Sequence, residues 1–88
     1  MSTFNLTVST PDGNRFSGDA QALFVRGSEG DLAVLANHAP LVTPVKECEC
    51  KILTDEGDEI KADIIGGLLS VADGGDTILL TMSFKTKE

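Results

Sequence analysis

The 88-residue sequence contains no tryptophan, no tyrosine and only four phenylalanines, so aromatic rings contribute little to its core. Leucine, valine and isoleucine must supply most of the buried surface. A chain of this length is expected to fold as one small domain, residues 1–88, and to bury roughly 60–65% of its unfolded surface. That is enough for a core, with little to spare.

Long apolar runs are also missing, and none approaches the ~20 residues that a membrane-spanning helix needs. The longest candidate, residues 64–72, is broken by Gly66, Gly67 and Ser70. The N-terminus has no basic region followed by an apolar one, so no secretory signal is predicted. We therefore expect a cytosolic protein that meets a membrane only through a partner.

Positive charge is scarce, with 7 Lys and Arg against 14 Asp and Glu, for a net charge of −7. This excludes an intrinsic nucleic-acid binder, which needs a basic stripe against phosphate, and disfavours adsorption to anionic lipid. A protein partner would present Lys or Arg. The alternative is that the charge only keeps a small protein soluble.

Only two cysteines and one histidine are present. Cys48 and Cys50 lie two apart in an alternating segment, which puts both thiols on one face of a strand, a poor geometry for a disulfide. A closed zinc site needs about four Cys or His ligands, and Cys48, Cys50 and His38 are three. We expect buried, reduced thiols, no metal site and no cofactor.

No catalytic residue is predicted. Nucleophilic catalysis needs an activated Ser, Cys or Thr with a base in reach, and His38 is the only imidazole. Gly27-x-x-Gly30 is too short for a phosphate-binding loop and does not open a helix. Residues 55–59 carry oxygens without the spacing of a calcium loop. These signals do not converge on one site, so the chain by itself is not expected to be an enzyme.

Apolar and polar residues alternate with a period of two through most of the chain, and turn signals recur every 8–12 residues or so. No window of helical length holds an apolar stripe free of glycine or proline. The pattern predicts an all-β sandwich or flattened barrel of nine or ten short strands. The expected strands are residues 4–8, 15–17, 20–26, 32–35, 41–45, 48–52, 60–64, 68–71 and 78–84.

Residues 48–52 and 60–64 form the clearest hairpin. Its polar faces can place Glu47 and Glu49 near Lys61, and Lys51 near Glu59 or Asp63, depending on the register. The glycine pair at 66–67 predicts a bulge or the close approach of another backbone. Residues 85–88 are polar and expected to fray.

Two turn clusters, residues 27–31 and 37–40, hold a local concentration of acid and the only histidine. In the simpler interpretation, His38 bonds a nearby backbone carbonyl and fixes its turn, whereas in the sharper one it contacts a partner. Glu29 and Asp31 are either solvated turn residues or acidic contacts to a basic partner.

Four segments resemble one family in order and spacing: F-S-G at 16–18, G-S-E-G-D at 27–31, N-H-A-P-L-V-T at 37–43 and G-G-L-L-S-V at 66–71. The family is the epsilon subunit of bacterial and chloroplast F-type ATP synthases, whose pattern is F-S-G, G-x-E-G-x, G-H-A-P-L-x-T and G-G-x-L-x-V. The resemblance implies a ten-stranded β-sandwich.

The resemblance also implies a function: a non-catalytic rotor subunit of the central stalk. Such a subunit binds the gamma subunit, sits on the c-ring and helps couple proton translocation to ATP synthesis, at the cytoplasmic face of the inner (plasma) membrane. By position, the implied c-ring side is Ser28, Glu29, Gly30 and Asp31. The implied gamma side is His38, Ala39, Pro40, Leu41 and Thr43.

The sequence departs from the family pattern in three places. Members usually continue into a C-terminal helical hairpin that can inhibit hydrolysis, whereas this sequence stops at Glu88, so we expect no autoinhibition by a hairpin. Asn37 replaces a glycine, and asparagine tolerates the left-handed conformation best among other residues. Cys48 and Cys50 replace apolar residues or glycine, as buried thiols would.

Two alternatives remain open. The chain could be a free-standing β-sandwich module for another protein partner, or a small metal or redox protein that uses Cys48, Cys50 and His38.

Overall fold

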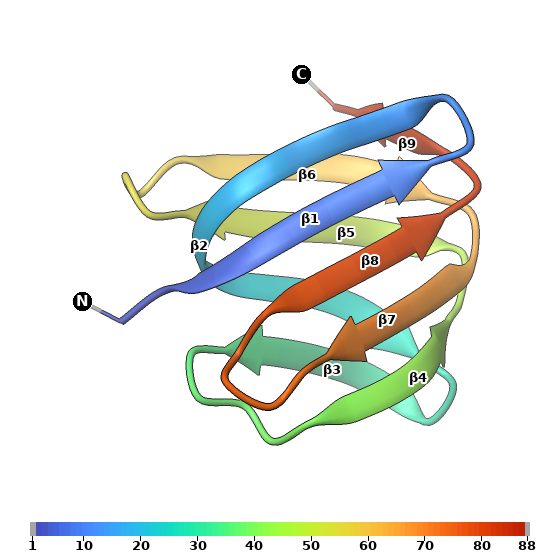
Figure 1. The fold of residues 1–88 in the computed structure, drawn as a ribbon. Coiled ribbons are helices and arrows are strands. Elements are labelled where there is room, and N and C mark those ends of the chain that lie inside the picture. The colour runs from blue at the N-terminus through green and yellow to red at the C-terminus, as the bar shows by residue number, and fades with distance from the viewer. Residues whose placement is uncertain (1, 88) are drawn as a thin grey trace.

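The structure is a computed structural model that describes residues 2–87 (Figure 1). Buried and exposed side chains alternate with a period of two along most of its strands. Residues 2–87 contain nine β-strands and no helix, and thus no helix long and apolar enough to cross a membrane. The all-β prediction is confirmed. The strands are β1 (Phe4–Thr10), β2 (Gly13–Gly27), β3 (Gly30–Leu35), β4 (Leu41–Val45), β5 (Cys48–Thr54), β6 (Glu59–Ile64), β7 (Gly67–Val71), β8 (Thr77–Thr81) and β9 (Phe84–Thr86).

Strand β2 belongs to both layers of the sandwich. Its first half pairs with β1 through Ala20, and its second half pairs with β5 and β3. One layer is therefore β2–β1–β8–β7–β4, and the other is β3–β2–β5–β6–β9 (Figure 1). Counting the two halves of β2 separately gives ten strands. The sequence suggested separate strands at 15–17 and 20–26, but the backbone continues between them without a break.

The core lies between the layers and is aliphatic, as expected. In β1, Phe4, Leu6 and Val8 are buried, and the residues between them point outward. Fully buried leucine and isoleucine side chains come from both layers, so burial of apolar surface joins them. These side chains are Leu6, Leu23, Ile52, Ile64, Leu69 and Leu79.

The β6–β7 connection crosses close to the end of β8, as the glycine pair predicted. Gly66 and Gly67 both have positive φ, at 55° and 146°. Gly67 pairs with Thr81, and the buried Thr81 hydroxyl donates a 2.7 Å hydrogen bond to the Gly66 carbonyl. This bond is the shortest that the buried Thr81 hydroxyl makes, and it ties the β6–β7 connection to the end of β8.

The register of the β5–β6 hairpin decides which charges meet. Lys51 lies directly opposite Lys61, and both reach Glu59, at 3.8 Å and 3.6 Å. The predicted Lys51–Glu59 pair is confirmed. This register places Glu49 directly opposite Asp63, with the predicted partner Lys61 only diagonal to it, so the lowered pKa of Glu49 owes more to Lys87 than to Lys61.

Lys87 compensates that like-charged pair. Its Nζ lies 2.9 Å from Glu49 and 3.3 Å from Asp63, and its backbone N–H bonds the Lys61 carbonyl. The hydrogen bond from Lys87 lowers the pKa of Glu49, and the bonds to Glu49 and Asp63 raise that of Lys87. The expected fraying of residues 85–87 is thus wrong, and Glu88 lies outside the described residues.

Candidate functional site

The outer faces of the two layers differ in charge. Strands β1, β4, β7 and β8 contain no Asp, Glu, Lys or Arg at any position. The outer face of the other layer instead carries the ion pairs of β5 and β6 and the Arg26–Asp31 pair. In a chain of net charge −7, four strands of one layer that carry no charge are unexpected for a surface that only meets water.

Exposed apolar side chains gather on that layer. Val42 is 65% exposed, Ile78 45%, Leu80 49% and Met82 68%. The register makes them neighbours, because Leu68 pairs with both Leu80 and Pro44, and Ser70 pairs with both Ile78 and Val42. We call this surface the uncharged face; its residues are Val42, Pro44, Leu68, Ser70, Ile78, Leu80 and Met82. A contiguous exposed apolar patch of this kind marks an interaction surface.

The residues predicted for the gamma side lie next to this face, but none of its residues is among them. Of the predicted gamma-side residues on β4, Leu41 and Thr43 pair with the buried Val71 and Leu69, so their side chains point toward the core side. Val42, the residue between them, points outward. The period of two in β4, combined with the apolar residues of β7 and β8, was the signal that could have revealed the face.

The loop before β4 holds the other predicted gamma-side residues, His38, Ala39 and Pro40. Asn37 adopts φ of 67°, as predicted for a residue in a glycine position. The Nδ1 of His38 lies 2.7 Å from the Ala39 carbonyl, so this nitrogen carries the proton and donates it. The His38 backbone N–H also bonds the Leu35 carbonyl. The simpler interpretation of His38, a residue that fixes its turn, is confirmed.

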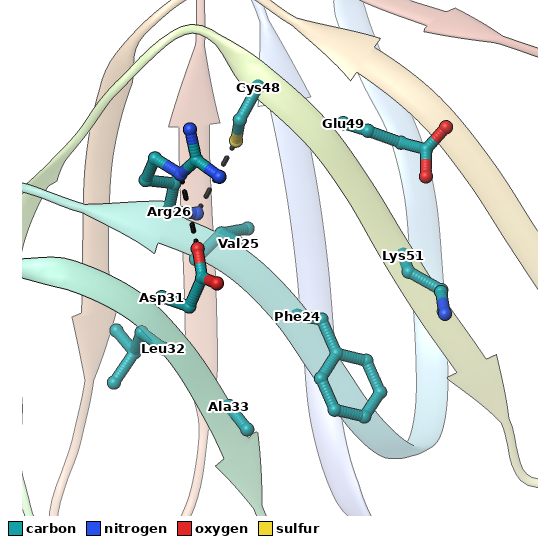
Figure 2. Close-up of a pocket in the computed structure, with 9 residues that line it drawn as sticks. All are labelled: Phe24, Val25, Arg26, Asp31, Leu32, Ala33, Cys48, Glu49 and Lys51. Atoms are coloured by element: carbon teal, nitrogen blue, oxygen red, sulfur yellow. Dashed lines mark hydrogen bonds and ion pairs between the residues drawn. The ribbon is translucent and has the colours of Figure 1, made fainter.

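The predicted c-ring turn, Ser28–Asp31, joins β2 to β3 at the opposite end of β3 from His38 (Figure 1). Asp31 is already paired, since its carboxylate lies 3.1 Å from the Arg26 guanidinium (Figure 2). Glu29 is exposed, and no ion pair within residues 2–87 involves it. The turn shares a shallow hollow with residues 41–44 of β4, so the structure brings the two predicted segments together there.

A second hollow lies on the charged layer, between β3 and β5 (Figure 2). Its groups satisfy one another: the Lys51 ammonium lies 5.6 Å from the centre of the Phe24 ring, and the Arg26 backbone N–H donates to Cys48 Sγ at 3.4 Å. Such contacts stabilise the surface of the protein by small amounts. They leave this hollow with no unpaired group that indicates a ligand.

The two cysteines share one face of β5, as predicted, and both are free thiols. Cys50 is fully buried, and burial raises its pKa to about 12, with a further contribution from Cys48. Cys48 is half-buried. His38 belongs to the β3–β4 connection, which lies at the end of the sandwich opposite the start of β5 (Figure 1). Within the described part of the chain, no three His, Cys, Asp or Glu side chains are placed to hold a metal. The structure therefore does not assemble the metal or redox site considered above.

The net charge is concentrated away from the predicted c-ring turn. The β5–β6 and β7–β8 turns contain acidic residues and no Lys or Arg, and both lie at the end of the sandwich opposite residues 28–29 (Figure 1). These acidic residues are Asp55, Glu56, Asp58, Asp73 and Asp76. The overall charge of −7 thus says little about the turn itself.

Comparison with known proteins gives a consistent set of similarities. Residues 3–83 match the family model described as ATP synthase, Delta/Epsilon chain, beta-sandwich domain. The ATP synthase epsilon chain of Brevibacillus brevis is 37% identical over 79 residues, which are 90% of this chain and 60% of that protein. The epsilon chain of a Bradyrhizobium strain is 35% identical over 88 residues, 100% of this chain and 64% of that protein. The chain thus spans about 60% of the length of these curated relatives.

Two solved structures share the fold. A chain in the Euglena gracilis mitochondrial ATP synthase (OSCP, F1 and c-ring) superposes with a TM-score of 0.90 at 23% identity, covering 98% of this chain and 54% of that one. A chain of the Tetrahymena thermophila mitochondrial ATP synthase central stalk and c-ring gives 0.79 at 14% identity, covering 94% and 66%.

Proposed function

This chain belongs to the delta/epsilon-chain β-sandwich family of ATP synthases, and from that premise we propose that it is a non-catalytic rotor subunit of the central stalk. In this role residues 1–88 form one domain that binds the gamma subunit and contacts the c-ring. It helps couple proton translocation to ATP synthesis at the cytoplasmic face of the membrane, which it meets only through the complex.

The observation that carries this proposal is the uncharged face. The centre of a stable protein interface is depleted of charge and rich in packed apolar side chains, and Val42, Leu68, Ile78, Leu80 and Met82 supply both properties. We assign this face to the gamma subunit. The predicted gamma-side residues His38, Ala39 and Pro40 then border it, because their loop leads directly into β4.

The first prediction introduces one charge into this face. Leu80→Lys places an ammonium among apolar side chains that the gamma subunit would desolvate, so we expect at least about tenfold weaker binding. The matched control is Leu35→Lys on β3, because Leu35 is 53% exposed and Leu80 49%, but Leu35 lies in the other layer. Binding of a cognate gamma subunit is measured by titration with the purified chain.

The results separate the candidate functions. Equal affinities for the two variants would contradict the assignment of the face. A wild-type chain that folds and does not bind gamma would overturn the rotor proposal and favour a free-standing module with another protein partner.

The c-ring contact is proposed at the turn Ser28–Asp31, and the geometry singles out one carboxylate. Asp31 is held by Arg26, whereas Glu29 projects from the turn itself. Exposed ion pairs contribute only about 0–1 kcal/mol each, so Glu29 would act together with its neighbours rather than as a single anchor.

The second prediction tests this turn. Glu29→Lys should weaken assembly with the membrane sector and lower ATP-driven proton pumping, while binding of the isolated chain to gamma stays unchanged. Glu56→Lys makes the same change in the β5–β6 turn, at the opposite end of the sandwich, and should have no effect. Proton pumping that is insensitive to Glu29→Lys would remove this turn as a contact.

A further inference from the structure

A hollow of about 420 Å³ opens in the uncharged face, where β7 and β8 meet the turn that follows β1. Leu68 and Leu80 form its sides. Ser9 borders it from β1, Pro11 borders it from the turn after β1, and Met82 closes it from the β8–β9 connection. Gly67 lines it at the start of β7.

The polar groups around the hollow are already engaged within the chain. The Ser9 hydroxyl donates to Asn14 Oδ1 at 2.7 Å, and the Thr10 hydroxyl donates to the Gly13 carbonyl at 3.2 Å. The Thr81 hydroxyl is held by the Gly66 carbonyl. No charged side chain lines the hollow. A polar or charged occupant would lose its hydration without gaining a side-chain partner, whereas an apolar one would not.

The rim can adapt to an occupant. Met82 is the most exposed large apolar side chain of the described residues, at 68%, and lies outside the regular strands. An unbranched thioether fits partner surfaces of varied shape. Binding energy concentrates where one large side chain fills a pocket and its surroundings exclude water.

We propose that this hollow receives one large apolar side chain of the gamma subunit and is the anchor point of that contact. The inference rests on the proposed function, because it takes gamma as the partner of the uncharged face. The hollow is continuous with that face, since Leu68 and Leu80 belong to both. The remaining residues of the face then contribute complementarity around one dominant contact.

The experiment fills the hollow from within. Ser9→Phe occupies it with the chain's own ring, and we expect binding of the cognate gamma subunit to weaken about tenfold or more. Asn5→Phe is the control, because it introduces the same aromatic ring on the same strand and face, four residues away and outside the hollow. We expect its affinity to stay within about threefold of the wild type.

A second variant keeps the proposal testable if Ser9→Phe does not fold. Met82→Ala removes one wall, and because Met82 is exposed the fold should be unaffected; we expect about fivefold weaker binding. Far-UV circular dichroism checks that each variant is folded. If the wild type binds gamma and both Ser9→Phe and Met82→Ala bind equally well, the anchor is disproved and the rotor proposal stands. If the wild type does not bind, both proposals fall.

Discussion

Gly67→Ala should strongly destabilise the fold. Gly67 has φ of +146°, which L side chains rarely adopt, and a methyl group there would overlap the Leu80 carbonyl oxygen. It would also stand 2.9 Å from the Leu80 carbonyl carbon and 3.0 Å from the Thr81 Cα. All three atoms are backbone of the paired strand β8, so no side chain can rotate away. We expect a loss of about 3 kcal/mol or more, from strain and overpacking together.

A loss of that size is a large part of the total stability. At about 0.05–0.15 kcal/mol per residue, an 88-residue domain has roughly 4–13 kcal/mol to lose. Because the chain has no tryptophan or tyrosine, unfolding in urea is best followed by far-UV circular dichroism rather than by intrinsic fluorescence.

Gly57→Ala shows how much stability is lost to backbone strain alone, without a steric clash of the added methyl group. Gly57 also has positive φ, at +91°, but nothing lies within 4 Å of an added methyl group. Only the conformational cost applies, about 1–2 kcal/mol. If the two variants lose the same stability, the close approach of β7 and β8 at Gly67 is not what requires glycine there.

The sequence predicted the parts of this fold that depend on local alternation. Most strands, the turn residues and the left-handed Asn37 follow from side-chain pattern and backbone preference, and these were confirmed. The glycine pair at 66–67 was predicted correctly as a close approach for the same reason. Its partner, Thr81, could not be predicted, because pairing 14 residues away depends on tertiary topology. Two strand predictions were wrong: residues 15–17 and 20–26 form the single strand β2, and the expected strand 78–84 is divided between β8 and β9, which pair with different neighbours.

Predictions were incomplete or wrong where register or long-range pairing decides. Whether Glu49 meets Lys61 or Asp63 depends on a shift along the hairpin that the alternating pattern does not fix. The last residues looked frayed because they are polar, yet β9 pairs with β6, and Lys87 reaches two carboxylates. Pairing with β6, which is distant in the sequence, therefore orders a segment that its polar composition alone predicted to be frayed.

The sequence predicted which segments lie near the candidate site, but it did not predict the face that several strands form together. The motif-bearing segments pointed to the turn at 28–31 and to residues 38–43, but a single strand does not show what lies beside it. Only the β4–β7–β8 pairing places Val42, Leu68 and Ile78 on one face. Functional surfaces of a sandwich are built across strands, so their residues are dispersed in the sequence.

Leu68 and Leu69 offer the sharpest test of this arrangement, since two adjacent leucines of β7 point in opposite directions. Leu69 is fully buried in the core, whereas Leu68 is 40% exposed on the uncharged face. Leu69→Ala should cost about 2–5 kcal/mol of stability, because it removes buried apolar contacts and leaves a cavity. Leu68→Ala should change stability by about 0.5 kcal/mol or less.

Binding should follow the opposite order. Leu68→Ala removes a side of the hollow and should weaken gamma binding about fivefold or more, whereas any Leu69→Ala molecules that remain folded present an intact face and should bind with nearly wild-type affinity. Urea unfolding and gamma affinity are measured for both variants. We expect one variant to lose stability and the other to lose affinity, and a general loss of structure could not produce both results. Parallel losses in both variants would mean that the gamma contact depends on the integrity of the sandwich as a whole. Opposed losses would locate binding in the outer face of β7, one residue away from the core that supports it.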